Sequence, residues 1–356
     1  MLTHPVTVLI APLDWGLGHA TRCYPIIQEI ERMGHEVILG ISGSSGKWLA
    51  NEFPHLRTVQ IPSYHMRYDE RLPAWLSIAM QIKPFIRSIH FEKKWLNSFI
   101  QNQKIDLIIS DNRYGLHHAQ IKSILITHQL HIPSRIFSLF NILARRINHR
   151  FLSAFNEVWI PDSPEINGLS GKLAHPPLKG IKTTYLGPLS RFYDNDINPV
   201  NTKTYRYCFI ISGPEPKRSK FENICLYIAK KTNLPCLIIR GTDKTRAITS
   251  SPHITVIDIA GTEELLKYIN QSSIVISRSG YSSIMDWVCI GAEAILVPTP
   301  GQPEQIYLAE YLHQQDMFTG ISEKELMNQG LPTMINRRKR TFDFHSFKQT
   351  LNKCLS

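Results

Sequence analysis

A short segment near the start of the chain combines two glycines with a histidine. The stretch PLDWGLGHATR (Pro12–Arg22) leads from an apolar run into a predicted helix and places Gly16 and Gly18 before His19. Glycines let a phosphate or sugar approach the main chain, and a helix amino terminus favours negative charge. The helix dipole would lower the proton affinity of His19, and a neutral imidazole can act as a general base. The alternative is that His19 is a helix cap or a structural histidine.

A second cluster lies in the stretch SRSGYSSIMD (Ser277–Asp286). A glycine and serines at the start of a helix that follows a strand favour anion binding. The planar guanidinium of Arg278 suits a pyrophosphate, and Asp286 could accept hydrogen bonds from ribose hydroxyls. The residues that we expect to contact such a ligand are Arg278, Ser279, Gly280, Ser282, Ser283 and Asp286.

Three more loops carry polar side chains after predicted strands. PTPGQPEQ (Pro298–Gln305) offers groups suited to sugar hydroxyls, namely Gln302, Glu304 and Gln305. SGPEPKRS (Ser212–Ser219) is a candidate phosphate loop with Ser212 and Gly213, in which two prolines remove amide donors and Lys217 and Arg218 could compensate with charge. SDNRYGLHH (Ser110–His118) supplies Asp111, a second candidate base. Ordinary turn and capping chemistry explains the glycines and serines one by one, but not the clustering of polar residues after strands.

The elements that position these loops alternate regularly. Short, continuous apolar strands separated by helices indicate parallel sheets covered on both faces. The predicted strands are Val6–Leu13, His35–Ser42, Arg57–Pro62, Ile105–Asp111, Ser123–Gln129, Glu157–Asp162, Tyr207–Gly213, Pro235–Gly241, His253–Ala260, Ser273–Gly280 and Glu293–Pro300. Ligands bind beyond the carboxyl ends of the strands in such sheets, which is where the candidate loops fall.

The alternation of strands and helices is interrupted once, by a polar stretch between Gly187 and Thr204, and then resumes. A chain of 356 residues is longer than one hydrophobic core usually supports. We therefore expect an α/β protein with two doubly wound, Rossmann-like domains facing across a cleft. Residues 1–190 would form the first domain, 191–205 a linker and 206–356 the second domain, whose last helix could pack back on the first.

The amino-acid composition indicates the cellular compartment and the class of partner. The six cysteines show no CxxC pair, which is typical of reduced thiols in a cytoplasmic protein. No signal peptide and no apolar run of the roughly 20 residues needed to span a membrane is visible. A net charge of +11 favours a polyanionic partner: nucleic acid, an anionic membrane or a phosphorylated substrate. No nucleic-acid-binding motif supports the first of these.

The order of the motifs resembles the GT-B glycosyltransferases, especially the MurG-type N-acetylglucosaminyltransferase group. The similarity covers most of the chain and is most specific in SRSG-x5-D and in the QPEQ that follows it. It implies that the histidine loop lies in the acceptor domain and faces the cleft, that Arg278 and Asp286 bind the nucleotide diphosphate and ribose, and that the pair Glu304–Gln305 contacts the donor sugar. GPLSR resembles the family's GNPVR, which makes Arg191 a candidate diphosphate contact. The implied reaction is an inverting displacement from a nucleotide diphosphate sugar, UDP-linked in the family, with no metal.

The chain departs from the family at three places. Asp286 is shorter than the family's glutamate, Glu304 replaces a glutamine, and SGPEPKRS replaces the usual GGSxG loop. Two other functions stay open. GLGHATRC resembles the GxGHxxRC loop of PseG-type nucleotide-sugar hydrolases, which pass the sugar to water, and the altered loops are compatible with a non-catalytic nucleotide-sugar sensor. No histidine spacing typical of a metal site is present, and the DxD triplet Asp194–Asp196 lies in the expected linker.

Two segments of the first half mix apolar and basic residues as interfacial helices do: Pro73–Ile100 and Ser134–Arg150. The first carries Trp75, Leu76, Ile78 and Ile82 together with Lys83, Arg87, Lys93 and Lys94. The alternative is that the apolar faces of these two helices only cover the sheet. We expect this half to dock on an anionic membrane from the cytoplasmic face, because MurG-type enzymes glycosylate a lipid-linked acceptor and carry a comparable apolar patch.

Overall fold

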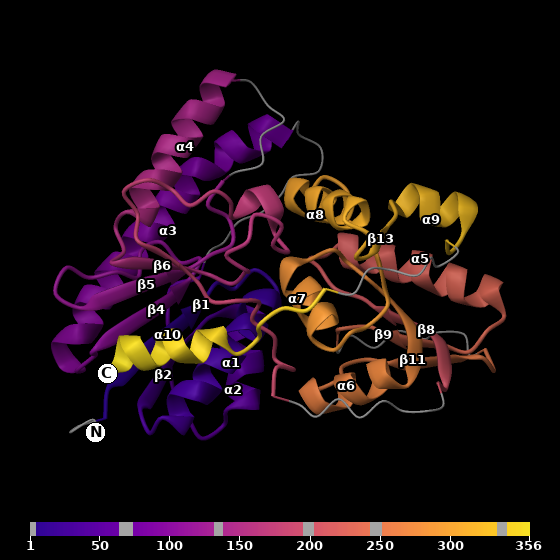
Figure 1. The fold of residues 1–356 in the computed structure, drawn as a ribbon, viewed down its shortest axis with the longest axis horizontal. Coiled ribbons are helices and arrows are strands. Elements are labelled where there is room, and N and C mark those ends of the chain that lie inside the picture. Colours follow the sequence, from indigo (N-terminus) through magenta and orange to yellow (C-terminus); the bar gives the residue numbers. More distant parts are fainter. Residues whose placement is uncertain (1–4, 64–73, 132–137, 195–202, 243–250, 333–339) are drawn as a thin grey trace. The chain divides into compact units, whose positions relative to one another are not determined.

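A computed structural model describes residues 5–63, 74–131, 138–194, 203–242, 251–332 and 340–356. The chain divides into two compact units (Figure 1). Unit 1 comprises residues 1–190 and 342–356, and unit 2 comprises residues 191–341.

Unit 1 is built on a parallel sheet with the strand order β3-β2-β1-β4-β5-β6-β7. Its strands are β1 (Thr7–Pro12), β2 (Glu36–Ile41), β3 (Arg57–Gln60), β4 (Leu107–Asp111), β5 (Lys122–Ile126), β6 (Glu157–Ile160) and β7 (Thr183–Tyr185). Its helices are α1 (Gly18–Arg32), α2 (Gly43–Glu52), α3 (Ala74–Asn102), α4 (Ser138–Leu152), the 3-10 turn η1 (Gly171–Leu173) and α10 (Ser346–Leu355).

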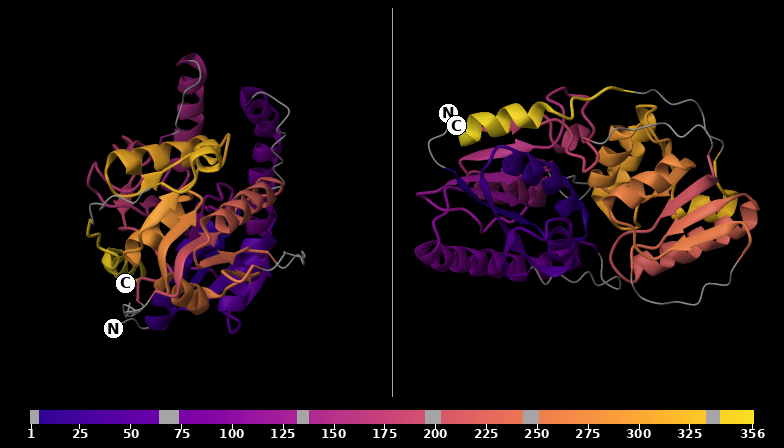
Figure 2. Two further views of the ribbon diagram at one scale, coloured as in Figure 1. Left: turned by 90° about the vertical axis from the view of Figure 1, so that its right-hand side faces the viewer. Right: turned by 90° about the horizontal axis from the view of Figure 1, so that it is seen from below.

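Helices cover both faces of the unit 1 sheet (Figure 2). On one face, Leu96 of α3 packs on Leu9 of β1 and Ile108 of β4, all of them fully buried. On the other face lie α1 and α10, where Lys348 of α10 pairs with Glu29 of α1 at 3.5 Å. The central strands are buried on both sides, which is why their sequences read as continuous apolar runs.

Unit 2 repeats this plan with the strand order β10-β9-β8-β11-β12-β13. Its strands are β8 (Tyr205–Ile210), β9 (Cys236–Ile239), β10 (Ile254–Ile257), β11 (Ser272–Ser277), β12 (Ala294–Leu296) and β13 (Thr319–Gly320). Its helices are α5 (Lys217–Thr232), α6 (Thr262–Asn270), α7 (Tyr281–Cys289), α8 (Pro303–Gln314) and α9 (Glu323–Gln329).

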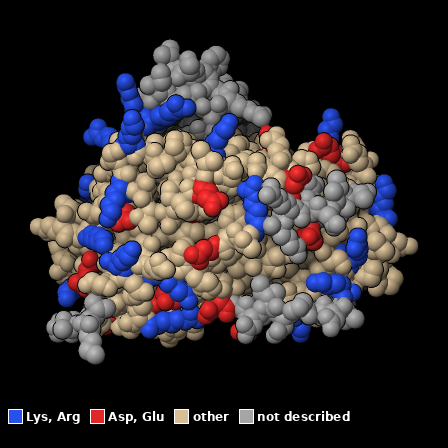
Figure 3. All heavy atoms as spheres, viewed as in Figure 1, with Lys and Arg blue, Asp and Glu red and all other residues tan. Residues whose placement is uncertain are grey.

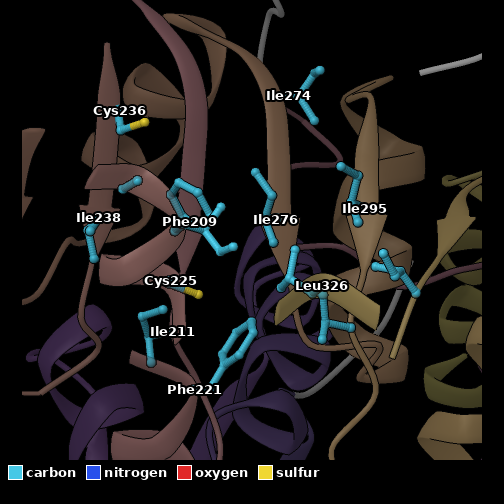
Figure 4. Close-up of a cluster of buried hydrophobic side chains, with 14 residues drawn as sticks. Phe209, Ile211, Phe221, Cys225, Cys236, Ile238, Ile274, Ile276, Ile295 and Leu326 are labelled. Carbon is cyan, nitrogen blue, oxygen red and sulfur yellow. The ribbon is translucent and has the colours of Figure 1, made fainter. Parts of the chain in front are cut away.

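Figure 4 shows the core on one face of the unit 2 sheet. Phe209 of β8 and Ile276 of β11 pack there against Phe221 and Cys225 of α5 and Leu326 of α9. Helix α9 begins with a capping box, in which Ser322 accepts from the Glu325 N–H and the Glu325 carboxylate accepts from the Ser322 N–H. The cap fixes where α9 starts and therefore how Leu326 enters the core.

The expected fold class is confirmed: both sheets are parallel and doubly wound. Their strand orders reverse between β1 and β4 and between β8 and β11, so each unit has a topological switch point. Two expected boundaries are wrong. Residues 342–356, which the second domain was expected to include, fall in unit 1, as the expectation for the last helix allowed, and the expected linker falls in unit 2, which begins at Arg191.

Candidate functional site

His19 lies at the switch point of unit 1. Strand β1 ends at Pro12, and the chain turns through Gly16, whose positive φ of 74° suits glycine, into α1. The N-cap of α1 is Leu17, and no side chain caps the helix, so His19 is not a cap. The neighbouring strand β4 ends at Asp111. The topology thus brings a histidine and a carboxylate from two loops to one place.

His19 and Asp111 form a dyad. Nδ1 of His19 lies 2.7 Å from Oδ1 of Asp111, and the Asp111 side chain is fully buried. The imidazole is 15% exposed, and its Nε2 makes no hydrogen bond with any described residue. Such a ring can hold a proton on Nδ1 and present a lone pair at Nε2, as a general base requires.

The pKa of His19 is lowered from its ordinary value of 6.5. Burial is the main cause, the positive charge of Arg22 adds to it, and the Asp111 carboxylate opposes both. The sequence interpretation attributed this effect to the helix dipole. Burial beside a cation explains the neutral ring instead.

Asp111 is not a base in its own right. Burial would raise its pKa, but Arg22 and His19 outweigh burial and lower it. Nε and Nη2 of Arg22 each donate to one oxygen of the carboxylate. The carboxylate is therefore charged and enclosed, and it orients the ring rather than reaching a substrate.

Sequence reasoning missed Arg22 and His128 as parts of this cluster. Arg22 follows His19 by three residues, which places both on one face of α1. Its Nη2 lies 2.8 Å from Nδ1 of His19, and its Nη1 lies 3.2 Å from Nδ1 of His128, which follows β5. The spacing of His19 and Arg22 was a usable signal, whereas the position of His128 needed the sheet order.

A second buried arginine lies at the same edge of the sheet, near the carboxyl ends of the strands. Arg113 donates to Glu92 of α3 at 2.6 Å, to Oγ of Ser42 at 2.8 Å, and to the carbonyl oxygens of Pro12 and Pro62. Arg113 and Glu92 are fully buried. This network ties the loop after β4 to α3 and to the ends of β1 and β2, so it fixes the backbone on which Asp111 sits.

In unit 2 the glycine-rich turns after β8 and β11 flank the switch point. Gly213 has φ 109° and lies with Ser212 in an exposed loop. Gly280 is the N-cap of α7, and nothing lies within 4 Å of where its Cβ would be. Ser282 and Ser283 follow in the first turn, half-buried. An open helix amino terminus of this kind accepts an anion.

Arg278 does not face this opening, which corrects the expectation that it binds a pyrophosphate. It is 2% exposed, and its guanidinium lies over the ring of Phe221, 3.8 Å from the centroid. Nη2 pairs with Glu323 at 2.6 Å, and Nη1 donates to the carbonyls of Val297 and Pro298. Ser279 is likewise buried and donates to the carbonyl of Gln305. Both residues hold loops together.

Asp286 is also in a different setting from the one expected. It is 2% exposed, and its Oδ2 accepts from Nε of Arg191 at 3.2 Å. The two residues expected to contact ribose and diphosphate therefore bind each other. Their pair joins the start of unit 2 to α7.

The loop before α5 offers a different cation. Arg218 is 7% exposed and pairs with Glu215 and Glu222, so it does not compensate for the missing amides as expected. Lys217 is half-buried, and its ammonium donates to the carbonyl of Pro300 at 3.0 Å. It reaches from the loop after β8 to the loop after β12, across the end of β11.

The turn after β12 places its polar residues as follows. Gln302 is the N-cap of α8, and Glu304 lies in the first turn, both half-buried. Gln305 accepts from the Thr299 N–H at 2.9 Å through its side-chain oxygen. Among the described residues, no group of three or more His, Cys, Asp and Glu is placed to hold a metal ion.

Helices α3 and α4 carry a surface rich in cations, which we call the basic face. Its exposed members in the described side chains are Lys83, Ile86, Arg87, Phe91, Lys93, Lys94, Arg145, Arg146, Ile147 and Arg150. Phe85 of α3 packs on Phe151 of α4 with centroids 5.9 Å apart. The only acid in the two helices is Glu92, which Arg113 pairs in the interior. Figure 3 shows blue side chains gathered over this part of unit 1.

The apolar residues expected to lead this surface, Trp75, Leu76, Ile78 and Ile82, have side chains outside the described residues, as do Ser134–Phe137. Within the described part of the chain, no helix is both long enough and apolar enough to cross a membrane.

Comparison with known proteins finds similarity to glycosyltransferases. Residues 230–343 match the family described as the glycosyltransferase family 28 C-terminal domain. An uncharacterised glycosyltransferase of Methanosarcina acetivorans is 23% identical over 308 residues, which is 82% of this chain and 79% of the relative. The UDP-N-acetylglucosamine--N-acetylmuramyl-(pentapeptide) pyrophosphoryl-undecaprenol N-acetylglucosamine transferase of Borreliella burgdorferi is 23% identical over 94% of this chain and 89% of its own length.

The solved structure of MurG from Acinetobacter baumannii shares the fold, with a TM-score of 0.54 and 11% identity over 92% of this chain and 89% of that chain. The protein is a glycosyltransferase with the GT-B fold, and it is similar to the MurG enzymes. As a glycosyltransferase it takes an activated sugar donor and a glycosyl acceptor. The matched family segment covers the switch-point turn of β11 and α7 and the turn into α8.

Proposed function

We propose that this glycosyltransferase is an inverting enzyme that moves a sugar from a nucleotide diphosphate sugar to a hydroxyl of a lipid-linked or cell-envelope acceptor. The observation that carries the proposal is the His19–Asp111 dyad at the switch point of unit 1, with Nε2 unbonded among the described residues. A ring oriented by a buried carboxylate is the arrangement that takes a proton from an attacking hydroxyl.

The reaction balances with this one base. The acceptor oxygen forms a bond to the anomeric carbon while its proton passes to Nε2 of His19. The bond between that carbon and the diphosphate oxygen breaks, and the nucleotide diphosphate leaves with the electron pair. Attack from the side opposite the leaving group inverts the anomeric carbon. Asp111 stabilises the imidazolium that forms, without itself receiving the proton.

The leaving diphosphate needs compensating positive charge. We assign this role to the N-terminus of α7 at Gly280 and to the ammonium of Lys217, since Arg278 lies under α5. Preorganised amides and a cation stabilise developing negative charge as a metal ion would. The proposed reaction therefore uses no metal. The sugar hydroxyls would contact Gln302 and Glu304 at the start of α8.

We propose UDP-N-acetylglucosamine as the first donor to test, because the Borreliella relative is named for that donor. The same relative is named for an undecaprenol-linked acceptor. Two features of unit 1 support a lipid-linked acceptor. Trp15 and Leu17, which flank Gly16, are 40% and 42% exposed, and the basic face offers seven cations beside exposed apolar side chains. Such a face binds anionic headgroups reversibly, which would place the enzyme on the cytoplasmic surface of the membrane.

The test begins with a donor screen by thermal shift using UDP-, GDP-, CMP- and dTDP-sugars, since a ligand that binds only the folded state raises the melting temperature. The stabilising donor is then incubated with and without a lipid-linked acceptor. Acceptor-dependent release of the nucleotide diphosphate, with inversion of the anomeric centre, supports the proposal. Release of free sugar without an acceptor would instead identify a hydrolase, and binding without turnover would identify a sensor.

A further inference from the structure

Two charged groups, Asp111 and Arg22, meet at Nδ1 of the His19 ring. Nδ1 lies 2.7 Å from Oδ1 of Asp111 and 2.8 Å from Nη2 of Arg22. The guanidinium of Arg22 is 2% exposed and forks the Asp111 carboxylate through Nε and Nη2. Its remaining nitrogen, Nη1, lies 3.2 Å from Nδ1 of His128. Nδ1 of His19 therefore lies next to the buried ion pair of Arg22 and Asp111.

The protons in this cluster follow from what each group can do. Arginine only donates, and a charged carboxylate only accepts. Because Arg22 and Asp111 neutralise each other, a second proton on His19 would add an uncompensated charge beside a buried cation. We assign the single proton of His19 to Nδ1, which donates it to Asp111 while Nη2 of Arg22 donates to the same carboxylate oxygen, and this assignment leaves a lone pair on Nε2. Nη1 of Arg22, which can only donate, points to Nδ1 of His128.

The other groups around the ring add no charge. Sγ of Cys23 lies 3.8 Å from Oδ2 of Asp111, and burial raises the pKa of its thiol well above the ordinary value. Tyr114 from the loop after β4 is also close, and burial raises its pKa to about 12. His19 therefore faces one fixed cation, on α1, and one fixed anion, at the end of β4.

We propose that Arg22 is a positioning residue for His19: by forking Asp111 it fixes the carboxylate that receives the Nδ1 proton, and by neutralising that carboxylate it keeps the ring in its uncharged form. This inference rests on the proposed role of His19 as the base. A histidine paired with a carboxylate alone is drawn toward the charged form. Arg22 offsets that pull, in agreement with the lowered pKa of His19.

A merely structural arginine would behave differently. Removal of such a residue would lower activity equally at every pH. Arg22→Met should instead leave the Asp111 charge acting on the ring, so that the pKa of His19 rises by about one unit or more. Arg22→Lys keeps a positive charge without the fork, so the pKa should stay within about half a unit of the wild-type value while the ring is held less firmly.

The experiment is a titration of His19 by NMR in the full chain, with ¹³C- and ¹⁵N-labelled histidine. His19→Gln assigns the signal among the 15 histidines. We expect the wild-type ring to titrate below 6.5 with its proton on Nδ1, and the Arg22→Met ring to titrate at least one unit higher. Arg32→Met is the control: it removes a cation from the same helix, but Arg32 pairs with Glu29 at 3.6 Å rather than with His19 or Asp111, so the pKa of His19 should not change.

A wild-type pKa at or above 6.5, a proton on Nε2, or an unchanged pKa in Arg22→Met would overturn the inference. If Arg22→Met does not fold, the wild-type titration and the Arg22→Lys variant still decide it. The readout needs neither donor nor acceptor. If the titration behaves as expected but His19→Gln retains full transfer activity, the proposed base is wrong while the coupling of Arg22 to the ring stands.

Discussion

The guanidinium of Arg278 stacks on the ring of Phe221, 3.8 Å from its centroid, with Glu323 paired to the same group. This relationship joins the turn after β11 to α5 and to the first residue of α9. Arg278→Ala should leave the buried side of Glu323 unpaired and open a gap beside Phe221. We expect a loss of about 3 kcal/mol in the free energy of unfolding, measured by urea denaturation. If Arg278→Ala keeps wild-type stability but loses affinity for the nucleotide, Arg278 is a ligand-binding residue instead.

Lys217 is expected to carry the function that the sequence assigned to Arg278. Lys217→Ala should weaken binding of the nucleotide diphosphate about 10- to 100-fold, the range for a hydrogen bond to a charged group. Isothermal calorimetry with UDP and GDP measures it. Lys220→Ala, an exposed lysine one turn further along α5, is the control and should bind as the wild type does. Equal affinities in both variants would contradict the assignment.

His19→Gln should lower kcat by about 10²- to 10⁴-fold, the usual contribution of a general base. The melting temperature should change little, because the buried Asp111 carboxylate keeps its two hydrogen bonds from Arg22. His55→Gln alters an exposed histidine of unit 1 that pairs with Glu31, and it should leave kcat unchanged. If His19→Gln retains its rate, another group takes the proton.

The rate should fall on the acid side with a midpoint below 6.5. The pKa of His19 is lowered mainly by burial, and the neutral ring is the active form. Activity is therefore full above that lowered pKa and is lost as the pH falls through it. Because the unfolded ring binds a proton more readily, this group also makes stability rise with pH up to about 6.5. A pH profile of kcat/KM between 4.5 and 8 checks the midpoint, and an acid limb above 6.5 would contradict it.

The basic face should bind anionic vesicles in a salt-sensitive manner. Changing Lys83, Arg87, Arg145 and Arg146 to Gln should weaken cosedimentation with phosphatidylglycerol vesicles more than 100-fold, since each cation contributes about 1 kcal/mol. The matched control changes the exposed Lys230 and Lys231 of α5 to Gln in unit 2. Wild-type protein that stays in the supernatant at low salt would favour a non-lipid acceptor.

Metal removal should have no effect on the proposed reaction. With donor and acceptor present, EDTA at millimolar concentration should leave the initial rate unchanged, and added Mg²⁺ should not raise it. The physical reason is that the N-terminus of α7 and Lys217 supply the positive charge. A rate that is lost with EDTA and restored by Mg²⁺ would place a cation at the diphosphate.

Most of the fold could be predicted from apolar runs. Strand β1 is buried along its whole length, so its sequence cannot be mistaken for a surface segment. The sequence analysis missed β7 and β13, which have three and two residues, because runs that short carry no periodicity. The loops that meet at each switch point were also predictable, since their position follows from parallel topology.

The roles of individual charges were less predictable. The motif placed Arg278 and Asp286 near a helix start, but it could not show that each side chain turns inward to a partner. Arg191 and Asp286 are 95 residues apart in the chain, and only the folded sheet brings them together. The His19–Asp111 contact spans 92 residues and was named only as two alternative bases. Local sequence spacing predicts helices, strands and turns. Contacts between residues far apart in the chain decide which charged side chains are available to bind a ligand.

The return of residues 342–356 to unit 1 bears on how the protein is made. A ribosome releases unit 2, residues 191–341, as one uninterrupted segment, whereas α10 of unit 1 emerges after it. Phe347 and Leu351 of α10 are buried, so unit 1 completes its core only after unit 2 has been synthesised. Unit 2 can therefore reach its final state first, reversing the usual order in which amino-terminal domains fold first. A stop codon before residue 342 would damage the dyad-bearing unit and spare the other one.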